Sequence, residues 1–219
     1  MTFKKNKYTI IRQAVSKELA AFIANYFCMK KQVYDTCRQE RYISPLTTLL
    51  GNYEGATQQV PHTYSSYADI AMETLLLKCQ PQMEKATGLK LYPAYTYARI
   101  YKKGDILKRH KDRFSCEIST TMNLGGDDWP IYLSPNENVG IPDGKNITFK
   151  SEAKGIKVDL KQGDMLVYSG CELEHWRKKF KGEECVQVFL HYNNSKTPGA
   201  IDNMFDRRKH LGLPSWFKK

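Results

Sequence analysis

Residues 163–192 read GDMLVYSGCELEHWRKKFKGEECVQVFLHY. Two runs rich in β-branched and aromatic residues, 165–169 and 185–192, stand on either side of a polar, charged segment that holds His175. A Gly-Asp turn at 163–164 precedes the first run. Short runs of this kind bounded by turn residues predict β-strands, so His175 lies between two predicted strands.

The same succession of short β-type runs and turns extends upstream to residue 91. We predict seven strands, at residues 95–101, 117–124, 129–133, 146–149, 157–160, 165–169 and 185–192. Turn sequences such as Gly125-Gly126-Asp127 separate them. Seven short strands within about a hundred residues favour an antiparallel barrel or sandwich.

The first third of the chain predicts helices instead. After Ser16, a helix-capping residue, apolar side chains recur at helical spacing, at Leu19, Phe22, Ile23, Tyr26 and Phe27. Ser66 and Asp69 form a capping-box-like pair before a second predicted helix, residues 70–86, which Gly88 ends. We expect these helices to pack on one outer face of the β structure.

These patterns divide one structural domain into three regions. Residues 1–90 form an N-terminal helical support region, which includes a long breaker-rich loop at 41–65. Residues 91–193 form the β core. Residues 194–219 form a basic tail, which we expect to lie over the surface or to be partly mobile.

Composition bounds the class of protein. Lys and Arg outnumber Asp and Glu by 34 to 23 in 219 residues, and the net charge of +11 favours anionic partners, nucleic acid among them. No run approaches the roughly 18 apolar residues of a membrane span, and the basic start leads into no apolar signal region. The six cysteines form no Cys-x-x-Cys pair, so we expect reduced thiols in a cytoplasmic protein without membrane contact.

A second motif lies upstream, where residues 107–112 read LKRHKD. On an extended segment His110 and Asp112 point to the same face, so both can reach one ion. With His175 they complete a set of two histidines and one carboxylate, which suits non-haem Fe(II) and leaves three coordination positions open. His-x-Asp alone is a weak signal, but its place in an ordered series of strands strengthens it.

In this order the segments resemble the Fe(II)/2-oxoglutarate-dependent oxygenase superfamily, and within it the small phage and bacterial members of the prolyl 4-hydroxylase-like branch. The resemblance covers about residues 95–192 and rests on Tyr101, Gly104, the His-x-Asp motif, the Gly-Asp turn and His175. It implies an α+β, mainly β fold, the double-stranded β-helix (jelly-roll, cupin-like). It also implies His110, Asp112 and His175 as the catalytic metal ligands, and Fe(II), 2-oxoglutarate and O2 as cofactors, with ascorbate as a candidate reductant.

The sequence departs from this family at one position. Members usually carry Arg or Lys about ten residues after the second iron histidine, where it pairs with the distal carboxylate of 2-oxoglutarate, but here that residue is Cys185. A buried carboxylate still needs a positive partner. Arg177 is our first candidate, with Lys181 and Arg99 after it, and Tyr101 matches the phenol that donates to the same carboxylate.

The resemblance implies a hydroxylase acting on a prolyl or other residue of a peptide or protein, with release of succinate and CO2. The alternative is a non-catalytic basic β-barrel module that binds nucleic acid or an acidic partner. The charge of +11 and the departure at Cys185 favour that alternative. The sequence does not define the oligomeric state.

Simpler roles compete for several of these residues. His110 and Asp112 also fit an exposed turn, and His175 also fits a histidine hydrogen-bonded by a neighbouring glutamate. Arg177 belongs to a charge run that is typical of a solvated face. We expect His191, in an apolar run, to be a core-packing residue. Aromatic residues that we expect to wall the site are Trp129, Trp176, Tyr92, Tyr95 and Tyr97.

Overall fold

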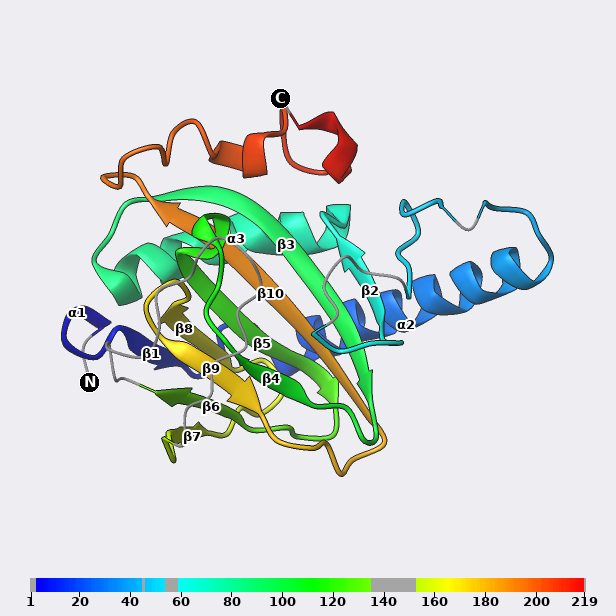
Figure 1. Ribbon diagram of the computed structural model, residues 1–219, viewed down its shortest axis with the longest axis horizontal. Coiled ribbons are helices and arrows are strands. Elements are labelled where there is room, and N and C mark those ends of the chain that lie inside the picture. The colour runs from blue at the N-terminus through cyan, green and yellow to red at the C-terminus, as the bar shows by residue number, and fades with distance from the viewer. Residues whose placement is uncertain (1–2, 45, 54–58, 135–152, 219) are drawn as a thin grey trace.

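The computed structural model describes residues 3–44, 46–53, 59–134 and 153–218, and its ten strands form two antiparallel sheets stacked face to face (Figure 1). The major sheet has the order β1 (Tyr8–Ile11), β8 (Met165–Ser169), β5 (Ile118–Gly126), β10 (Glu184–Asn194), β3 (Leu91–Lys102), β2 (Tyr64–Tyr67). The minor sheet has the order β4 (Leu107–His110), β9 (Glu174–Arg177), β6 (Ile131–Ser134), β7 (Ile156–Val158). The helical segments are α1 (Phe3–Asn6), α2 (Lys17–Gln39), α3 (Ile70–Thr87), η1 (Phe114–Cys116), η2 (Met204–Arg207) and η3 (Ser215–Phe217).

From β3 to β10 the chain passes from one sheet to the other at nearly every connection. This alternation is the double-stranded β-helix, so the predicted fold class, α+β and mainly β, is confirmed. Six of the seven predicted strands are present, as β3, β5, β6, β7, β8 and β10. The seventh, at 146–149, lies outside the described residues.

Four strands were not predicted, namely β1, β2, β4 and β9. Each has only four residues, too few for a clear alternation of apolar and polar positions. The predicted loop at 41–65 is wrong at its end, because β2 begins at Tyr64 and pairs with β3.

The helix ends follow local hydrogen bonding. Ser16 caps α2 and Gly88 ends α3 in the left-handed conformation at φ 74°, both as predicted. Asp69 is the N-cap of α3 and accepts a backbone N–H from its first turn. The predicted pairing of Ser66 with Asp69 is wrong, because Ser66 belongs to β2, where its backbone pairs with β3.

Helices α2 and α3 cover the outer face of the major sheet, as predicted (Figure 1). Side chains of β10 alternate between the two faces of the sheet. Val188 and Leu190 pack with the helices, whereas Cys185, Gln187 and His191 are buried on the face toward the minor sheet. With both faces covered, the strand reads as a nearly continuous apolar run, and the space between the sheets is left for the polar residues of the site.

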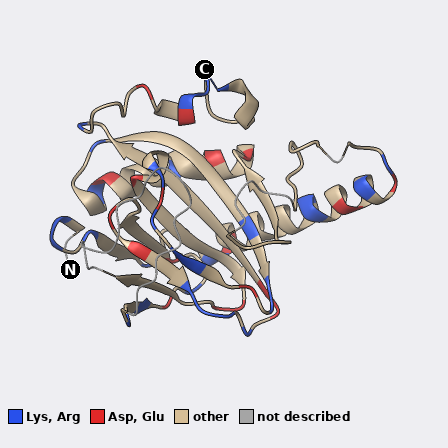
Figure 2. Ribbon diagram, viewed as in Figure 1, with Lys and Arg blue, Asp and Glu red and all other residues tan. Residues whose placement is uncertain are grey.

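Charged side chains lie mainly on the helices and connections, where Lys or Arg and Asp or Glu are interspersed, as along α2 (Figure 2). Across the described ranges, no helix is both long and apolar enough to span a bilayer. The six cysteines are free thiols.

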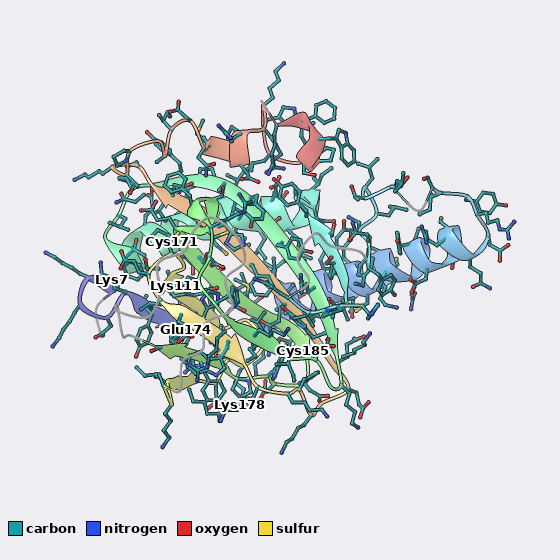
Figure 3. The ribbon with its side chains drawn as sticks, viewed as in Figure 1. Lys7, Lys111, Cys171, Glu174, Lys178 and Cys185 are labelled. Carbon is teal, nitrogen blue, oxygen red and sulfur yellow. The ribbon has the colours of Figure 1, made fainter. Side chains whose placement is uncertain are left out.

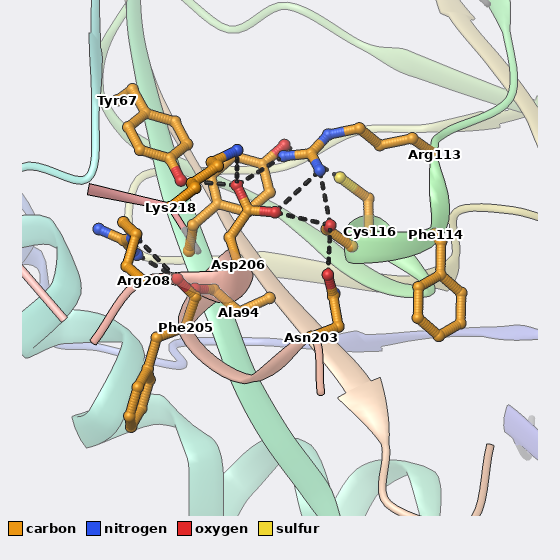
Figure 4. A network of polar contacts seen from close by, with 12 residues as sticks. Tyr67, Ala94, Arg113, Phe114, Cys116, Asn203, Phe205, Asp206, Arg208 and Lys218 are labelled. Carbon is orange, nitrogen blue, oxygen red and sulfur yellow. Dashed lines mark hydrogen bonds and ion pairs between the residues drawn. The ribbon is translucent and has the colours of Figure 1, made fainter. Parts of the chain in front are cut away.

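The C-terminal segment, residues 195–218, lies over β3 and is anchored through the carboxylate of Asp206 (Figure 4). Asp206 accepts hydrogen bonds from Arg113 (2.9 Å), Ser115 (2.7 Å) and Tyr67 (2.6 Å), and Lys218 lies 2.6 Å from it. Burial by itself raises the pKa of this carboxyl, but the basic partners outweigh burial and hold the pKa well below its usual range. The basic tail is therefore held to the core by a buried charge cluster.

We expect Asp206→Asn to lower the free energy of unfolding by about 2–3 kcal/mol, because it leaves two cations around a neutral side chain. Urea denaturation measures the change. The matched control is Asp159→Asn, which removes an exposed ion pair with Lys157 and is expected to cost less than about 0.5 kcal/mol. Equal effects of the two substitutions would contradict the anchoring role.

The effect has a defined pH dependence. Because folding lowers the pKa of Asp206, its stabilising contribution is complete above the ordinary value of 3.8 and is lost as the pH falls below that value. The difference between wild type and Asp206→Asn therefore shrinks on acidification.

Candidate metal centre and active-site cavity

The structure brings the three predicted ligands together at one end of the space between the sheets. His110 on β4 and His175 on β9 are directly opposite partners in the antiparallel pair, and their ring centroids lie 4.1 Å apart. Asp112 follows just beyond β4, and its backbone N–H donates to the carbonyl of Gly170 (2.9 Å). Its Oδ1 lies 3.7 Å from His110 Nε2 and 3.5 Å from His175 Nε2.

Backbone carbonyls fix which nitrogen each histidine presents. Nδ1 of His110 donates to the carbonyl of Lys108 (2.8 Å), and Nδ1 of His175 donates to that of Leu173 (3.0 Å). A carbonyl oxygen only accepts, so both hydrogens are on Nδ1 and both Nε2 lone pairs face Asp112. This orientation through the second nitrogen is typical of metal-binding histidines.

The charges at the site suit a divalent cation. Burial, with His175 nearby, lowers the pKa of His110 to about 4, so this imidazole is neutral at physiological pH. Asp112 supplies the carboxylate of the group. Donor atoms of the three residues lie within 4.8 Å of one another. Nitrogen and carboxylate donors in this number fit Fe(II) and related metals.

The second oxygen of Asp112 has a separate partner. Oδ2 accepts a hydrogen bond from the hydroxyl of Ser119 (3.0 Å). The bend that brings Asp112 here requires Gly170, because a Cβ at that position would lie 2.4 Å from Asp112 Oδ2 and 2.3 Å from the carbonyl oxygen of Cys116. Sequence reasoning missed both Ser119 and Gly170, because neither belongs to the residue types that bind metals in the motifs considered.

Another group of three possible ligands, Asp112, Cys116 and His191, lies next to the first. Burial raises the pKa of the Cys116 thiol well above its ordinary value, and its Sγ lies 3.1 Å from the hydroxyl of Tyr95. A metal needs the thiolate, which this setting disfavours. Nδ1 of His191 is 2.9 Å from Ser119 Oγ. We therefore favour His110, Asp112 and His175 as the group that binds a metal.

A cavity of about 660 Å³ leads from the three ligands to the surface. Its wall on β3 consists of Tyr95, Tyr97, Arg99 and Tyr101, and its outer part is lined by Asn52, Ser65, Tyr67, Pro214, Ser215 and Lys218. His191, which we expected to be a packing residue, is buried but also lines the cavity. The long loop and the C-terminal segment thus both shape the cavity.

Of the predicted aromatic walls, only Tyr95 and Tyr97 line the cavity. Trp129 instead packs edge-on against Tyr101, with ring centroids 4.8 Å apart. Trp176 stacks on Tyr132 with centroids 5.7 Å apart, and Tyr92 also lies outside the cavity lining.

The residues predicted to hold 2-oxoglutarate occupy different settings. Tyr101 and Arg99 line the cavity, and burial raises the pKa of Tyr101, so its phenol stays a hydrogen-bond donor. Arg177 is 1% exposed and does not line the cavity itself; its guanidinium lies over the ring of Trp129, which packs against Tyr101. Lys181 is exposed in the connection between β9 and β10, away from the cavity lining.

Arg177 is a buried cation whose described partners are all uncharged. Its guanidinium donates to the carbonyl of Trp129, to Thr121 Oγ1 (2.9 Å) and to Gln187 Oε1 (3.3 Å), and its Nε has no acceptor among the described residues. Gln187 in turn donates to Cys185 Sγ (3.1 Å). Figure 3 shows Cys185 toward one end of the sandwich and Cys171, on the turn before β9, toward the other. Arg177 thus extends from β9 to Gln187 on β10, two residues after Cys185.

Comparisons with known proteins identify the class of fold. No protein-family model and no curated protein matches the sequence. Among solved structures, a prolyl-4-hydroxylase from Pseudomonas putida matches 88% of this chain and 95% of its own, with a TM-score of 0.53 and 14% identity. The non-heme alpha ketoglutarate dependent carbocyclase SnoK from nogalamycin biosynthesis matches 97% of this chain and 90% of its own, with a TM-score of 0.62 and 12% identity.

A third similar structure is HygX from Streptomyces hygroscopicus with nickel and 2-oxoglutarate bound, which matches 89% of this chain and 85% of its own at a TM-score of 0.54 and 12% identity. The chain therefore has the fold of the 2-oxoglutarate-dependent oxygenases, as the resemblance of its motifs implied.

We expect the protein to bind one Fe(II) or Co(II) per chain, and His110→Ala to abolish this stoichiometric binding, because it removes one of three protein ligands. Anaerobic calorimetric titration measures it. Cys116→Ser is the control, since it alters only the second ligand group and is expected to leave the affinity unchanged. Loss of the metal in Cys116→Ser, with His110→Ala still binding, would assign the metal to the other group.

Proposed function

We propose that this protein is an Fe(II)- and 2-oxoglutarate-dependent oxygenase. The observation that carries the proposal is the convergence of two Nε2 lone pairs and one Oδ1 at the inner end of a cavity, with both imidazoles fixed through Nδ1. Three protein donors on one side of a metal leave room for a chelating cosubstrate and O2. The similar folds of known oxygenases support the same conclusion.

His110, Asp112 and His175 would hold Fe(II), and Tyr101 with an arginine would hold the far carboxylate of 2-oxoglutarate. When bound, these cofactors supply the oxidation: O2 is reduced, 2-oxoglutarate is converted to succinate and CO2, and one oxygen atom enters a C–H bond of the substrate. The chain itself orients the ligands and excludes water from the buried end of the cavity.

Arg177 is the arginine that we assign to the distal carboxylate. It is buried, its described partners leave its charge unbalanced, and it bonds Gln187, which in turn bonds Cys185 at the place of the family's usual base. An incoming carboxylate would supply the missing charge, and Tyr101, which lines the cavity and packs against Trp129 as Arg177 does, would donate to it. Arg99 lines the same wall and is the second candidate, whereas exposed Lys181 has no such support.

The substrate that we propose is a prolyl or other residue of a peptide or protein. The cavity lining includes the aromatic side chains of Tyr67 and Tyr97, which can pack against an apolar ring. The prolyl-4-hydroxylase among the similar structures supports this substrate class. We also expect the protein to work in the cytoplasm, a reducing compartment in which its six free thiols persist.

The alternative, a non-catalytic module for nucleic acid or an acidic partner, rests on the net charge of +11. It does not account for the two histidines oriented through Nδ1 or for a buried cavity that ends on them. Binding of nucleic acid through contacts to its phosphates weakens steeply as the salt concentration rises.

Anaerobic addition of 2-oxoglutarate to the Fe(II) protein is expected to produce the visible charge-transfer band of the chelate. On exposure to air, the protein is expected to release succinate, at a higher rate when a proline-containing peptide is present. Asp112→Ala is expected to abolish both signals, because it removes the only carboxylate ligand. No band at saturating cofactor would contradict the oxygenase, whereas a band without peptide stimulation would contradict only the substrate class.

We expect Arg177→Met to raise the Kd of 2-oxoglutarate about 30- to 100-fold, since a charged hydrogen bond contributes about 2–3 kcal/mol and 1.4 kcal/mol is tenfold. The chelate band gives this Kd without turnover. Arg177→Lys keeps the charge and is expected to fall between wild type and Arg177→Met.

Lys181→Met is the matched control, because it removes an exposed positive charge and is expected to leave the Kd near that of wild type. Thermal melts establish that each variant is folded. A large loss in Arg99→Met with none in Arg177→Met would move the carboxylate partner to β3 and overturn the assignment.

A further inference from the structure

Two residues outside the predicted site connect the major sheet to the metal ligand Asp112. Ser119 on β5 and His191 on β10 are directly opposite partners in the antiparallel pair of these strands. Their side chains meet on the face toward the minor sheet, where Ser119 Oγ lies 2.9 Å from His191 Nδ1 and 3.0 Å from Asp112 Oδ2. Ser119 is fully buried and His191 is 6% exposed. The register of the sheet therefore fixes this contact.

The hydrogen bonds run in one direction. The carboxylate of Asp112 only accepts, so the hydroxyl hydrogen of Ser119 points to Oδ2. The carbonyl of Cys116, 2.8 Å away, competes for the same hydrogen, but an ionised carboxylate is the stronger acceptor. Because Ser119 has one hydrogen, its oxygen accepts from His191, and Nδ1 of His191 carries the donated hydrogen. His191 therefore donates to Ser119, and Ser119 donates to Asp112.

Aromatic neighbours hold the ring of His191 in this orientation. Tyr95, its opposite partner on β3, lies against the ring with centroids 4.5 Å apart. Tyr67 in turn stacks on Tyr95 with centroids 5.0 Å apart. The ring of His191 is thus held in place. A donor with a fixed position favours one position of its acceptor, which here is Ser119 Oγ.

We propose that Ser119 and His191 are positioning residues of the metal centre, which hold Oδ2 of Asp112 away from the metal and leave Oδ1 as the single ligand oxygen. This inference rests on the proposed function and deepens it. A carboxylate free to rotate can offer both oxygens to a metal and occupy a position that the cosubstrate or O2 requires. The two residues thus preserve the open positions of the centre, and their loss weakens binding of the correctly oriented carboxylate.

The test is the affinity of the full-length protein for Fe(II), measured anaerobically by calorimetry, together with the visible absorption of the Co(II) form. Ser119→Ala is expected to weaken Fe(II) binding about 10- to 100-fold, as removal of an outer hydrogen-bond partner does elsewhere. His191→Phe keeps the aromatic packing on Tyr95 but removes the donor, and is expected to weaken binding in the same direction. Both are expected to change the Co(II) spectrum, which a purely structural defect does not do.

Conservative variants are expected to restore the affinity for Fe(II). Ser119→Thr keeps the hydroxyl, and the amide of His191→Asn places a donor near the position of Nδ1, so both are expected to recover most of the affinity. Because His191 acts through Ser119, the double variant Ser119→Ala with His191→Phe is expected to bind no more weakly than Ser119→Ala alone. Ser134→Ala, at a buried serine of β6, is the matched control and is expected to leave the affinity and spectrum as in wild type.

The outcomes separate this inference from the proposed function. If His110→Ala loses the metal but His191→Phe and Ser119→Ala keep wild-type affinity and spectra, the metal centre stands and the positioning role is overturned. Additive losses in the double variant would show that His191 acts independently of Ser119, which also overturns it. If His110→Ala binds as wild type does, the proposed function itself fails.

Discussion

The site depends on the antiparallel pairing of β4 with β9, which sets His110 opposite His175. Opposite residues in such a pair have close side chains, so the two imidazoles converge without any long-range adjustment. The turn at Gly170 then holds the backbone of Asp112 beside them. A shift of one residue in this register would turn one histidine to the other face of the sheet, and no donor set would remain.

The carboxylate of Asp112 contacts residues of both sheets. One oxygen faces the histidines of the minor sheet, and the other faces Ser119 of the major sheet. The adjoining Arg113 pairs with Asp206, so the C-terminal segment that lines the outer cavity is attached one residue away from Asp112, the proposed metal ligand (Figure 4). The inner and outer parts of the cavity are therefore built around neighbouring positions of one short loop.

The strands with long apolar runs were predictable because both of their faces are buried, as in β10. The short strands β4 and β9 were not, because they are rich in polar residues and show no alternating pattern. Arg177 illustrates the same limit. Its sequence neighbours are those of a solvated charge run, yet β9 turns its side chain between the sheets, where it is 1% exposed. Whether a charged side chain is buried depends on the hydrogen-bond partners that the opposite sheet offers. The local sequence does not contain this information.

The sequence by itself determined the longer strands of the core, the cap of α2, the three metal-ligand candidates and the absence of a base at position 185, because each depends on residue type and spacing. Only the tertiary structure decided that His191 reaches Asp112 through Ser119, that Asp206 anchors the C-terminal segment, and that Arg177 donates to Thr121. Except for Ser119 and Asp112, which are seven positions apart, the residues in these contacts are tens of positions apart in the chain, so no local pattern of residue types contains them.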